Sequence, residues 1–151
     1  GEEDRGAAHI GELGFGAGVF YLYICINREL LQENLEGDAA LTRNALNAFM
    51  QTVAKVSPIG KQNSFASRAY AGFVLAEKGD QQPRSLSQAF LKPVKPNQKE
   101  GEDTLSRAIK ELTRRRDNFN AVYGDCADAC AQFNVETGEG SLGELAEFVA
   151  N

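Results

Sequence analysis

The longest unbroken apolar run in the chain is the ten-residue stretch GVFYLYICIN, residues 18–27. Apolar side chains occupy both its odd and its even positions, whereas a strand with one solvent-exposed face alternates apolar and polar residues. β-Branched and aromatic residues dominate the run, which favours a strand over a buried helix. We therefore expect residues 18–27 to form a strand inside a sheet, covered on both faces by the rest of the chain.

The bulk properties are those of a small globular protein. A chain of 151 residues fits one domain and is long enough to bury a core of its own. No apolar run reaches the roughly 18 residues of a membrane helix. The start, GEEDRG, is too acidic for a signal peptide, and three loosely spaced cysteines indicate free thiols. These features predict a cytoplasmic location.

The remaining patterns predict an α+β fold in which helices pack on a small sheet. Strands are expected at residues 18–27 and 65–75, joined by a helix into a β-α-β unit, and a short strand within residues 125–136. Asp38 and the capping box that begins at Ser141 mark two helix starts. The expected helices span residues 27–38 (a short turn), 39–57, 84–91, 104–124 and 142–149.

The apolar spacing within two of these helices predicts which face each one buries. Leu46, Phe49, Met50 and Val53 fall on one side of the helix over residues 39–57. A similar stripe runs along the helix over residues 104–124, which Asp103 or Thr104 opens and Gly124 ends. The apolar stripe of that second helix comprises Leu105, Ala108, Ile109, Leu112, Phe119 and Val122.

Charge is distributed unevenly along the chain, whose net charge is −5. Residues 84–116 carry nine basic and four acidic side chains, whereas residues 117–151 carry seven acidic and no basic ones. Local potential, more than net charge, steers a polyanion to a surface. The basic block therefore indicates either a nucleic-acid contact or an ordinary solvated helix face. The basic side chains of its main helix are Arg107, Lys110, Arg114, Arg115 and Arg116.

The residues that carry chemistry do not form a recognisable catalytic or metal-binding set. Cys126 and Cys130 are spaced as C-x3-C, and the single histidine, His9, is far away in sequence, so two small thiols are a better interpretation than a metal site. The glycines of residues 14–18 precede an expected strand, the wrong order for a dinucleotide fold. We expect no enzyme activity and no cofactor. A small nuclease dependent on His9 remains an alternative, although no partner for that histidine is apparent.

A tight turn at residues 60–64, GKQNS, places an ammonium, an amide and a hydroxyl at the expected start of a strand. Such groups suit phosphate or ribose contacts, which position a nucleic-acid strand without reading its bases. Taken alone, the pattern is also that of an ordinary surface turn.

Several motifs together resemble those of a known family. GAAHIG, GVFYLYICINRELLQENLEG, PIGKQNSFA and SLSQAFLKPVK precede a C-terminal leucine-bearing helix, and this order is similar to that of the CasC family, the repeated backbone subunit of the type I-E CRISPR complex Cascade. The resemblance covers about residues 6–149. It implies a modified RRM-like, ferredoxin-like palm of which this chain forms about the C-terminal half. Residues 1–17 would be part of a thumb arm, and residues 18–151 the C-terminal part of the palm with additional helices.

The resemblance also implies a function. Copies of such a subunit line up along one CRISPR RNA (crRNA), hold it by its phosphates and leave the reading of target DNA to base pairing, as part of antiviral defence. The implied partners are crRNA, target DNA, further copies of the chain and the other Cascade subunits, with no membrane. No catalytic role is implied.

Particular residues match the motifs of that family. His9 and Ile10 match thumb positions beside a displaced base, where an apolar wedge helps to break stacking. Lys61 and Gln62 match a GKQ turn near the RNA or the neighbouring subunit. The resemblance likewise gives Lys92 and Lys95 a place facing target DNA. At a third basic position of that run this chain has Asn97, which predicts a weaker or shifted contact.

A second interpretation stays open beside the first. The alternative is an α+β protein-interaction domain whose basic helix, residues 104–124, docks an acidic partner.

Overall fold

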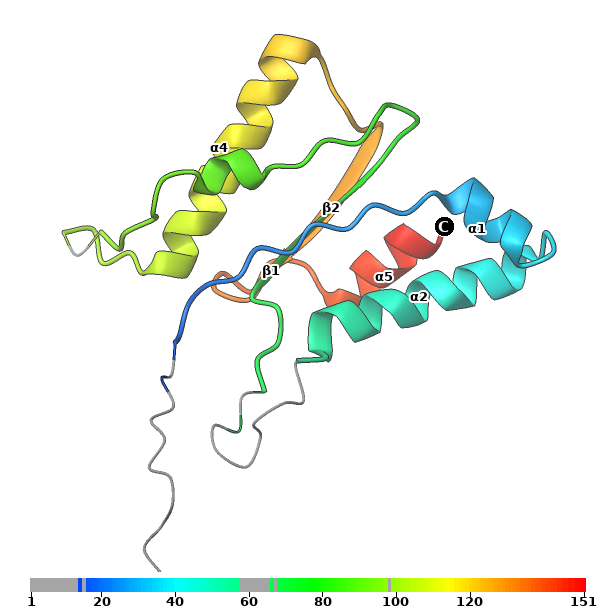
Figure 1. Ribbon diagram of the computed structural model, residues 1–151, viewed down its shortest axis with the longest axis horizontal. Helices are drawn as coiled ribbons and strands as arrows, with labels where there is room; N and C mark the ends of the chain where they lie inside the picture. The colour runs from blue at the N-terminus through cyan, green and yellow to red at the C-terminus, as the bar shows by residue number, and fades with distance from the viewer. Residues whose placement is uncertain (1–13, 15, 58–65, 67, 98) are drawn as a thin grey trace, which may run out of the picture.

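The computed structural model describes residues 14, 16–57, 66, 68–97 and 99–151 of the chain. Their helices and antiparallel strand pair confirm the predicted α+β class. Within these residues no helix is both long and apolar enough to cross a membrane. The elements, shown in Figure 1, are α1 (Arg28–Asn34), α2 (Ala39–Lys55), β1 (Phe73–Lys78), the 3-10 helix η1 (Ser87–Phe90), α4 (Thr104–Tyr123), β2 (Ala129–Asn134) and α5 (Leu142–Ala150).

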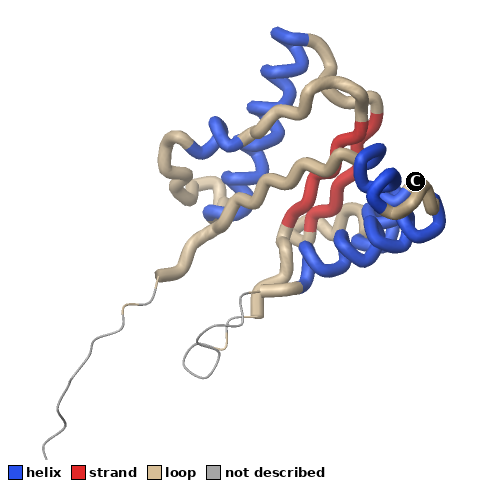
Figure 2. The backbone as a smooth tube through the Cα atoms, turned by 45° about the vertical axis from the view of Figure 1, so that its right-hand side comes forward, coloured by secondary structure: helices blue, strands red, loops and turns tan. Residues whose placement is uncertain are grey.

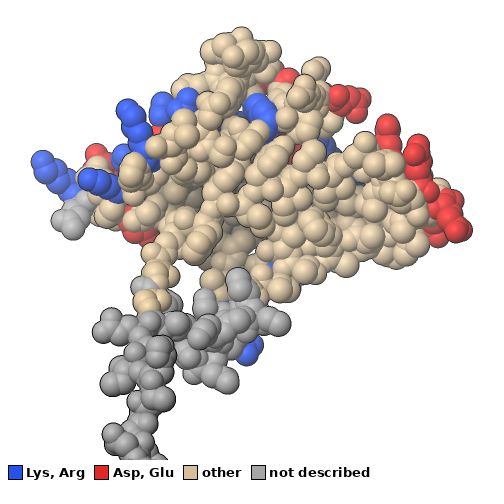
Figure 3. All heavy atoms as spheres, in the orientation of Figure 1, with Lys and Arg blue, Asp and Glu red and all other residues tan. Residues whose placement is uncertain are grey.

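The sheet consists of β1 and β2, which run antiparallel from the pair Phe73↔Asn134 to the pair Lys78↔Ala129. Helices α2 and α5 lie together on one side of this strand pair, and α4 with η1 lies on the other (Figure 2). Charge follows the same division. On the face shown in Figure 3, basic side chains gather over the half that holds α4, and acidic ones gather over α1.

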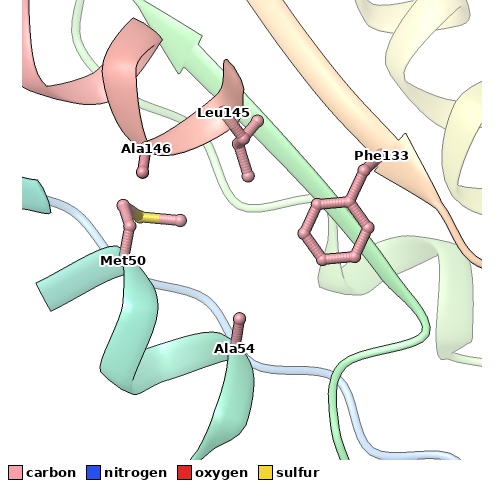
Figure 4. Packing of buried hydrophobic residues seen from close by; sticks show 5 residues of the cluster. All are labelled: Met50, Ala54, Phe133, Leu145 and Ala146. Carbon is pink, nitrogen blue, oxygen red and sulfur yellow. The ribbon is translucent and has the colours of Figure 1, made fainter. Parts of the chain in front are cut away.

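The core lies where α2, α5 and β2 meet. Met50 and Ala54 of α2 face Leu145 and Ala146 of α5, and Phe133 of β2 closes the cluster (Figure 4). Leu145 is 1% exposed and Ala146 is completely buried. Burying a side chain of leucine size contributes about 1.5–3 kcal/mol, so this cluster anchors both helices to the sheet.

The buried face of α2 is rotated relative to the predicted one. Its buried residues recur at every fourth position, and the predicted Phe49 is instead 36% exposed. The apolar spacing alone fits more than one face, and packing against α5 selects the face with the smaller side chains. The buried residues are Thr42, Leu46, Met50 and Ala54.

The helix starts are confirmed by their caps. The Asp38 carboxylate accepts a 2.9 Å hydrogen bond from the Leu41 amide, and the Asp103 carboxylate accepts a 2.7 Å bond from the Ser106 amide. At α5, the Ser141 hydroxyl accepts from the Glu144 amide, which is one of the two bonds of the predicted capping box, and it donates to the Glu144 carboxylate. These side chains satisfy amide groups that a helix start leaves without partners.

The predicted central strand over residues 18–27 is wrong. This segment, the blue chain that leads into α1 in Figure 1, is extended but forms no ladder with any described residue. Most of its large apolar side chains are exposed, from Tyr21 at 37% to Phe20 at 89%, and Ile26 is half-buried. A strand needs a hydrogen-bonded neighbour as well as apolar side chains, and β1 and β2 pair with each other instead. The segment is held by Tyr21, whose hydroxyl accepts a 3.2 Å bond from the Leu86 amide and whose ring lies 5.2 Å from that of Phe90.

Three further predictions need adjustment. The strand expected over residues 65–75 begins at Phe73 and runs on to Lys78, and Tyr70 is 71% exposed. The helix expected over residues 84–91 is reduced to the single 3-10 turn of η1. Val122, placed on the apolar stripe of α4, is 74% exposed. The buried residues of α4, Ala108 and Leu112, lie in its first half, and its last turn is exposed to solvent.

Candidate nucleic-acid interface

The lysines predicted to face nucleic acid lie on the loop between η1 and α4. Lys92 and Lys95 are exposed, and neither ammonium has an ion pair or hydrogen bond with a described residue. Lys99, on the same loop, is exposed as well. Reciprocal backbone hydrogen bonds of 2.9 and 3.0 Å between Asn97 and Glu102 close this loop against the start of α4. The loop therefore presents ammonium groups on flexible side chains that are free to meet an anion.

The cations of α4 are arranged differently. Arg107 lies 3.5 Å from the Glu102 carboxylate, and Lys110 contacts the same group. The Glu102 side chain is only 12% exposed. The hydrogen bond from Lys110, supported by Arg107, holds the pKa of this carboxyl below its usual range. One carboxylate thus neutralises much of the first half of the predicted basic face.

The second half of α4 follows the same pattern. Arg114 lies 2.6 Å from the Glu111 carboxylate, and Arg116 lies 3.0 Å from that of Asp117. The hydrogen bond from Arg114 lowers the pKa of the Glu111 carboxyl. Most of the predicted basic face is therefore a salt-bridged helix surface, the arrangement typical of an ordinary solvated helix. Arg115 is the exception among the cations of α4, because it has no ion pair within the described chain.

A polar network that sequence reasoning missed fixes this half of the molecule. Arg84 donates a 2.6 Å hydrogen bond to the side-chain oxygen of Asn120 on α4 and lies 3.4 Å from the Glu77 carboxylate on β1. Its side chain is 17% exposed. Glu77 and Asn120 are 43 positions apart in sequence, and no periodic pattern relates them. No signal in the sequence could therefore have found this network.

The thiols lie apart from the basic loop. The Cys126 thiol is 3.5 Å from the carbonyl oxygen of Gln82, and Cys130 lies opposite Glu77 in the strand pair. In the described part of the chain, no group of three or more acidic, cysteine or histidine side chains is placed to hold a metal ion. On the far side of the sheet, Lys78 lies 4.4 Å from the centre of the Phe148 ring, a contact that the sequence did not indicate.

The other predicted site residues cannot be placed. His9 and Ile10, and likewise Lys61 and Gln62, lie outside the described residues. Their roles at a displaced base and at a GKQ turn stay predictions. Of the predicted contacts, the structure places Lys92 and Lys95, and it puts both on one exposed loop.

The comparison with protein families decides the broad identity. The family described as CT1975-like protein matches residues 1–149. The chain belongs to this family of CRISPR-associated (Cas) proteins. A comparison with curated proteins gives no significant match. Membership of a Cas family is thereby shown, whereas the narrower resemblance to CasC of type I-E stays a prediction.

The described interface of this CT1975-like protein suits contacts to a nucleic-acid backbone. Ammonium groups on a loop attract phosphates regardless of base sequence, and releasing the counterions of the nucleic acid makes such contacts sensitive to salt. Among the described residues of this half, the cations without an ion pair include Lys92, Lys95, Lys99 and Arg115.

Proposed function

We propose that this CT1975-like protein is a non-catalytic, crRNA-binding backbone subunit of a type I-E CRISPR surveillance complex. It would hold guide RNA by its phosphates and aid recognition of target DNA in cytoplasmic antiviral defence. Its partners would be crRNA, target DNA, other copies of the chain and other Cascade subunits. The observation that carries the proposal is an exposed loop in the basic half of a Cas protein, on which Lys92 and Lys95 have no ion pair with any described residue.

The physical argument rests on which charges are available. A phosphate that approaches α4 meets cations that already have carboxylate partners, and it must displace one of them. A phosphate that approaches Lys92 or Lys95 displaces only water and counterions, which favours binding at ordinary salt concentration. Contacts that depend on the charge of lysine side chains, and not on the edges of bases, also suit a subunit that leaves sequence recognition to base pairing.

The alternative, a basic helix that docks an acidic protein, is less well supported. It places the partner on α4, where Glu102, Glu111 and Asp117 already occupy most of the cations. A docking helix is expected to keep those charges free for its partner.

Binding to single-stranded RNA tests the proposal first. Fluorescence anisotropy of a labelled single-stranded RNA should show binding by the wild-type chain that weakens steeply between roughly 50 and 200 mM salt. Absence of binding at the lowest salt would overturn the proposed function. RNA cleavage would contradict the non-catalytic assignment.

The two lysines are tested in a guide-loaded complex with duplex target DNA. Lys92→Ala with Lys95→Ala should weaken target binding and reduce the slope of log K against log salt by about 0.9 for each phosphate that the variant no longer neutralises. The matched control, Arg43→Ala with Lys55→Ala, removes two exposed cations of α2 on the other side of the sheet and should leave the slope unchanged. An unchanged slope in the Lys92 and Lys95 variant would exclude these contacts.

A further inference from the structure

Arg115 is the cation of α4 that the helix leaves without a partner. Its Nε atom is buried and makes no hydrogen bond. Nε atoms of Arg84 and Arg107 are also unsatisfied, but the terminal nitrogens of both side chains have carboxylate partners. Within the described chain, the Arg115 guanidinium has neither a hydrogen bond nor an ion pair.

A carboxylate within one helical turn of Arg115 is hydrogen-bonded to Arg114, and Arg115 acts on it only through space. Glu111, one helical turn away, accepts bonds of 3.1 and 2.6 Å from Nε and a terminal nitrogen of Arg114, both on the same carboxylate oxygen. Within the described chain the terminal nitrogens of Arg115 also make no hydrogen bond, but they are not buried, so an anion from outside the chain can reach them.

We propose that Arg115 contacts a phosphate of single-stranded guide RNA, and that the ion-paired cations of α4 do not. This inference rests on the proposed function and deepens it by selecting one residue among the five cations of the helix. The planar guanidinium fork matches two phosphate oxygens, which a lysine cannot reproduce. Arg115 is only partly buried, so the fork remains accessible to a ligand. It belongs to α4, and basic side chains gather over the half of the molecule that holds this helix (Figure 3).

Arg115→Gln tests this assignment, with Arg114→Gln as the matched control one position earlier on the same helix. Glutamine keeps much of the side-chain stem and removes the charge. In the single-stranded RNA experiment, Arg115→Gln should reduce the salt slope by about 0.7, the value for one phosphate contact to a single strand. Arg114→Gln should leave the slope unchanged. Arg115→Lys should restore most of the slope with a lower affinity, because the charge returns without the fork.

Thermal unfolding, measured in parallel, separates binding from a structural role. A lower melting temperature for Arg115→Gln with an unchanged salt slope would show that Arg115 only supports the fold, and would overturn the inference. An equal reduction of the slope in Arg114→Gln would overturn it too. RNA would then respond to the positive charge of α4 as a whole and not to a contact with Arg115.

Two other outcomes are equally decisive. If Arg115→Gln weakened binding of polyglutamate and left the RNA slope unchanged, the residue would serve an acidic polypeptide instead of RNA. If the wild-type chain bound no RNA, the proposed function and this inference would fail together. RNA binding that depends on the η1–α4 loop but not on Arg115 would overturn the inference alone.

Discussion

The Arg84 guanidinium donates a 2.6 Å hydrogen bond to the side-chain oxygen of Asn120, 36 positions further along the chain. The same guanidinium lies 3.4 Å from the Glu77 carboxylate, whose side chain is 23% exposed. One side chain from the loop before η1 therefore links β1 to α4. Because these groups are largely shielded from water, their mutual attraction is stronger than that of a surface ion pair.

Replacing this arginine should loosen α4 from the sheet. Arg84→Ala leaves a largely buried carboxylate and amide without their donor, so we expect the free energy of unfolding to fall by about 2 kcal/mol. Urea denaturation measures the change. Arg43→Ala, which removes an exposed arginine of α2, should change it by less than about 0.5 kcal/mol. A similarly small effect for Arg84→Ala would show that the network does not hold α4 in place.

Two glycines after β2 share a backbone conformation and differ in their surroundings. Gly138 has φ of 70° and Gly140 has φ of 68°, but only at Gly140 would an added Cβ collide with neighbours, the Gln132 carbonyl oxygen and Phe133. Both alanine variants incur the strain of a left-handed conformation, about 1 kcal/mol. Gly140→Ala should cost about 2 kcal/mol more, because the added methyl overpacks the strand. Equal destabilisation of the two variants in urea would contradict the crowding at Gly140.

The exposed apolar segment offers a direct test of the corrected fold. Phe20 is 89% exposed and Leu145 is 1% exposed. Phe20→Ala should therefore change the free energy of unfolding by less than about 0.5 kcal/mol, whereas Leu145→Ala should lower it by about 3 kcal/mol. The sequence-based expectation of a buried strand predicts a decrease of about 3–5 kcal/mol for Phe20→Ala. Chemical denaturation of the two variants separates these interpretations.

The Glu102 carboxyl should make stability depend on pH in the acid range. Lys110 and Arg107 lower its pKa in the folded state, so below neutral pH the unfolded chain takes up its proton first. Stability from this carboxylate is complete above the unfolded pKa, about 4.3, and is lost as the pH falls through the lower folded pKa. Urea denaturation over a pH series should show a smaller acid-induced destabilisation for Glu102→Gln than for wild type.

A matched carboxylate controls for the general effect of acid. Glu136 is exposed and its side chain has no ion pair with a described residue. Glu136→Gln should follow the wild-type pH profile. If the stability of Glu102→Gln followed the same pH dependence as that of the wild type, the contacts of Glu102 with Lys110 and Arg107 would contribute little to folding.

The parts of the fold that the sequence predicted well depend on local signals. Asp103 before the first turn and Gly124 after the last delimit α4 closely, and the Ser141 box marks the start of α5. These signals act within one turn of the chain, so no knowledge of the fold is needed to interpret them. The exposure of Lys92 and Lys95 follows in the same way from a polar, proline-rich loop.

The parts that were missed depend on contacts between distant segments. Residues 18–27 have the composition of a buried strand, but composition does not show which strand, if any, lies beside them. The sequence placed Arg107 and Lys110 on one basic helix, yet it could not show that Glu102 forms an ion pair with both. Partner choice in sheets and ion pairs is a property of the folded chain.

The meeting of α2 with α5 has a consequence for how the protein is made. Met50 and Ala54 are synthesised before Leu145 and Ala146, which cover them. Contacts between such distant segments slow folding, since the chain must first close a long loop. Until residues 142–150 have been made, the apolar side of α2 therefore remains uncovered and open to chaperones.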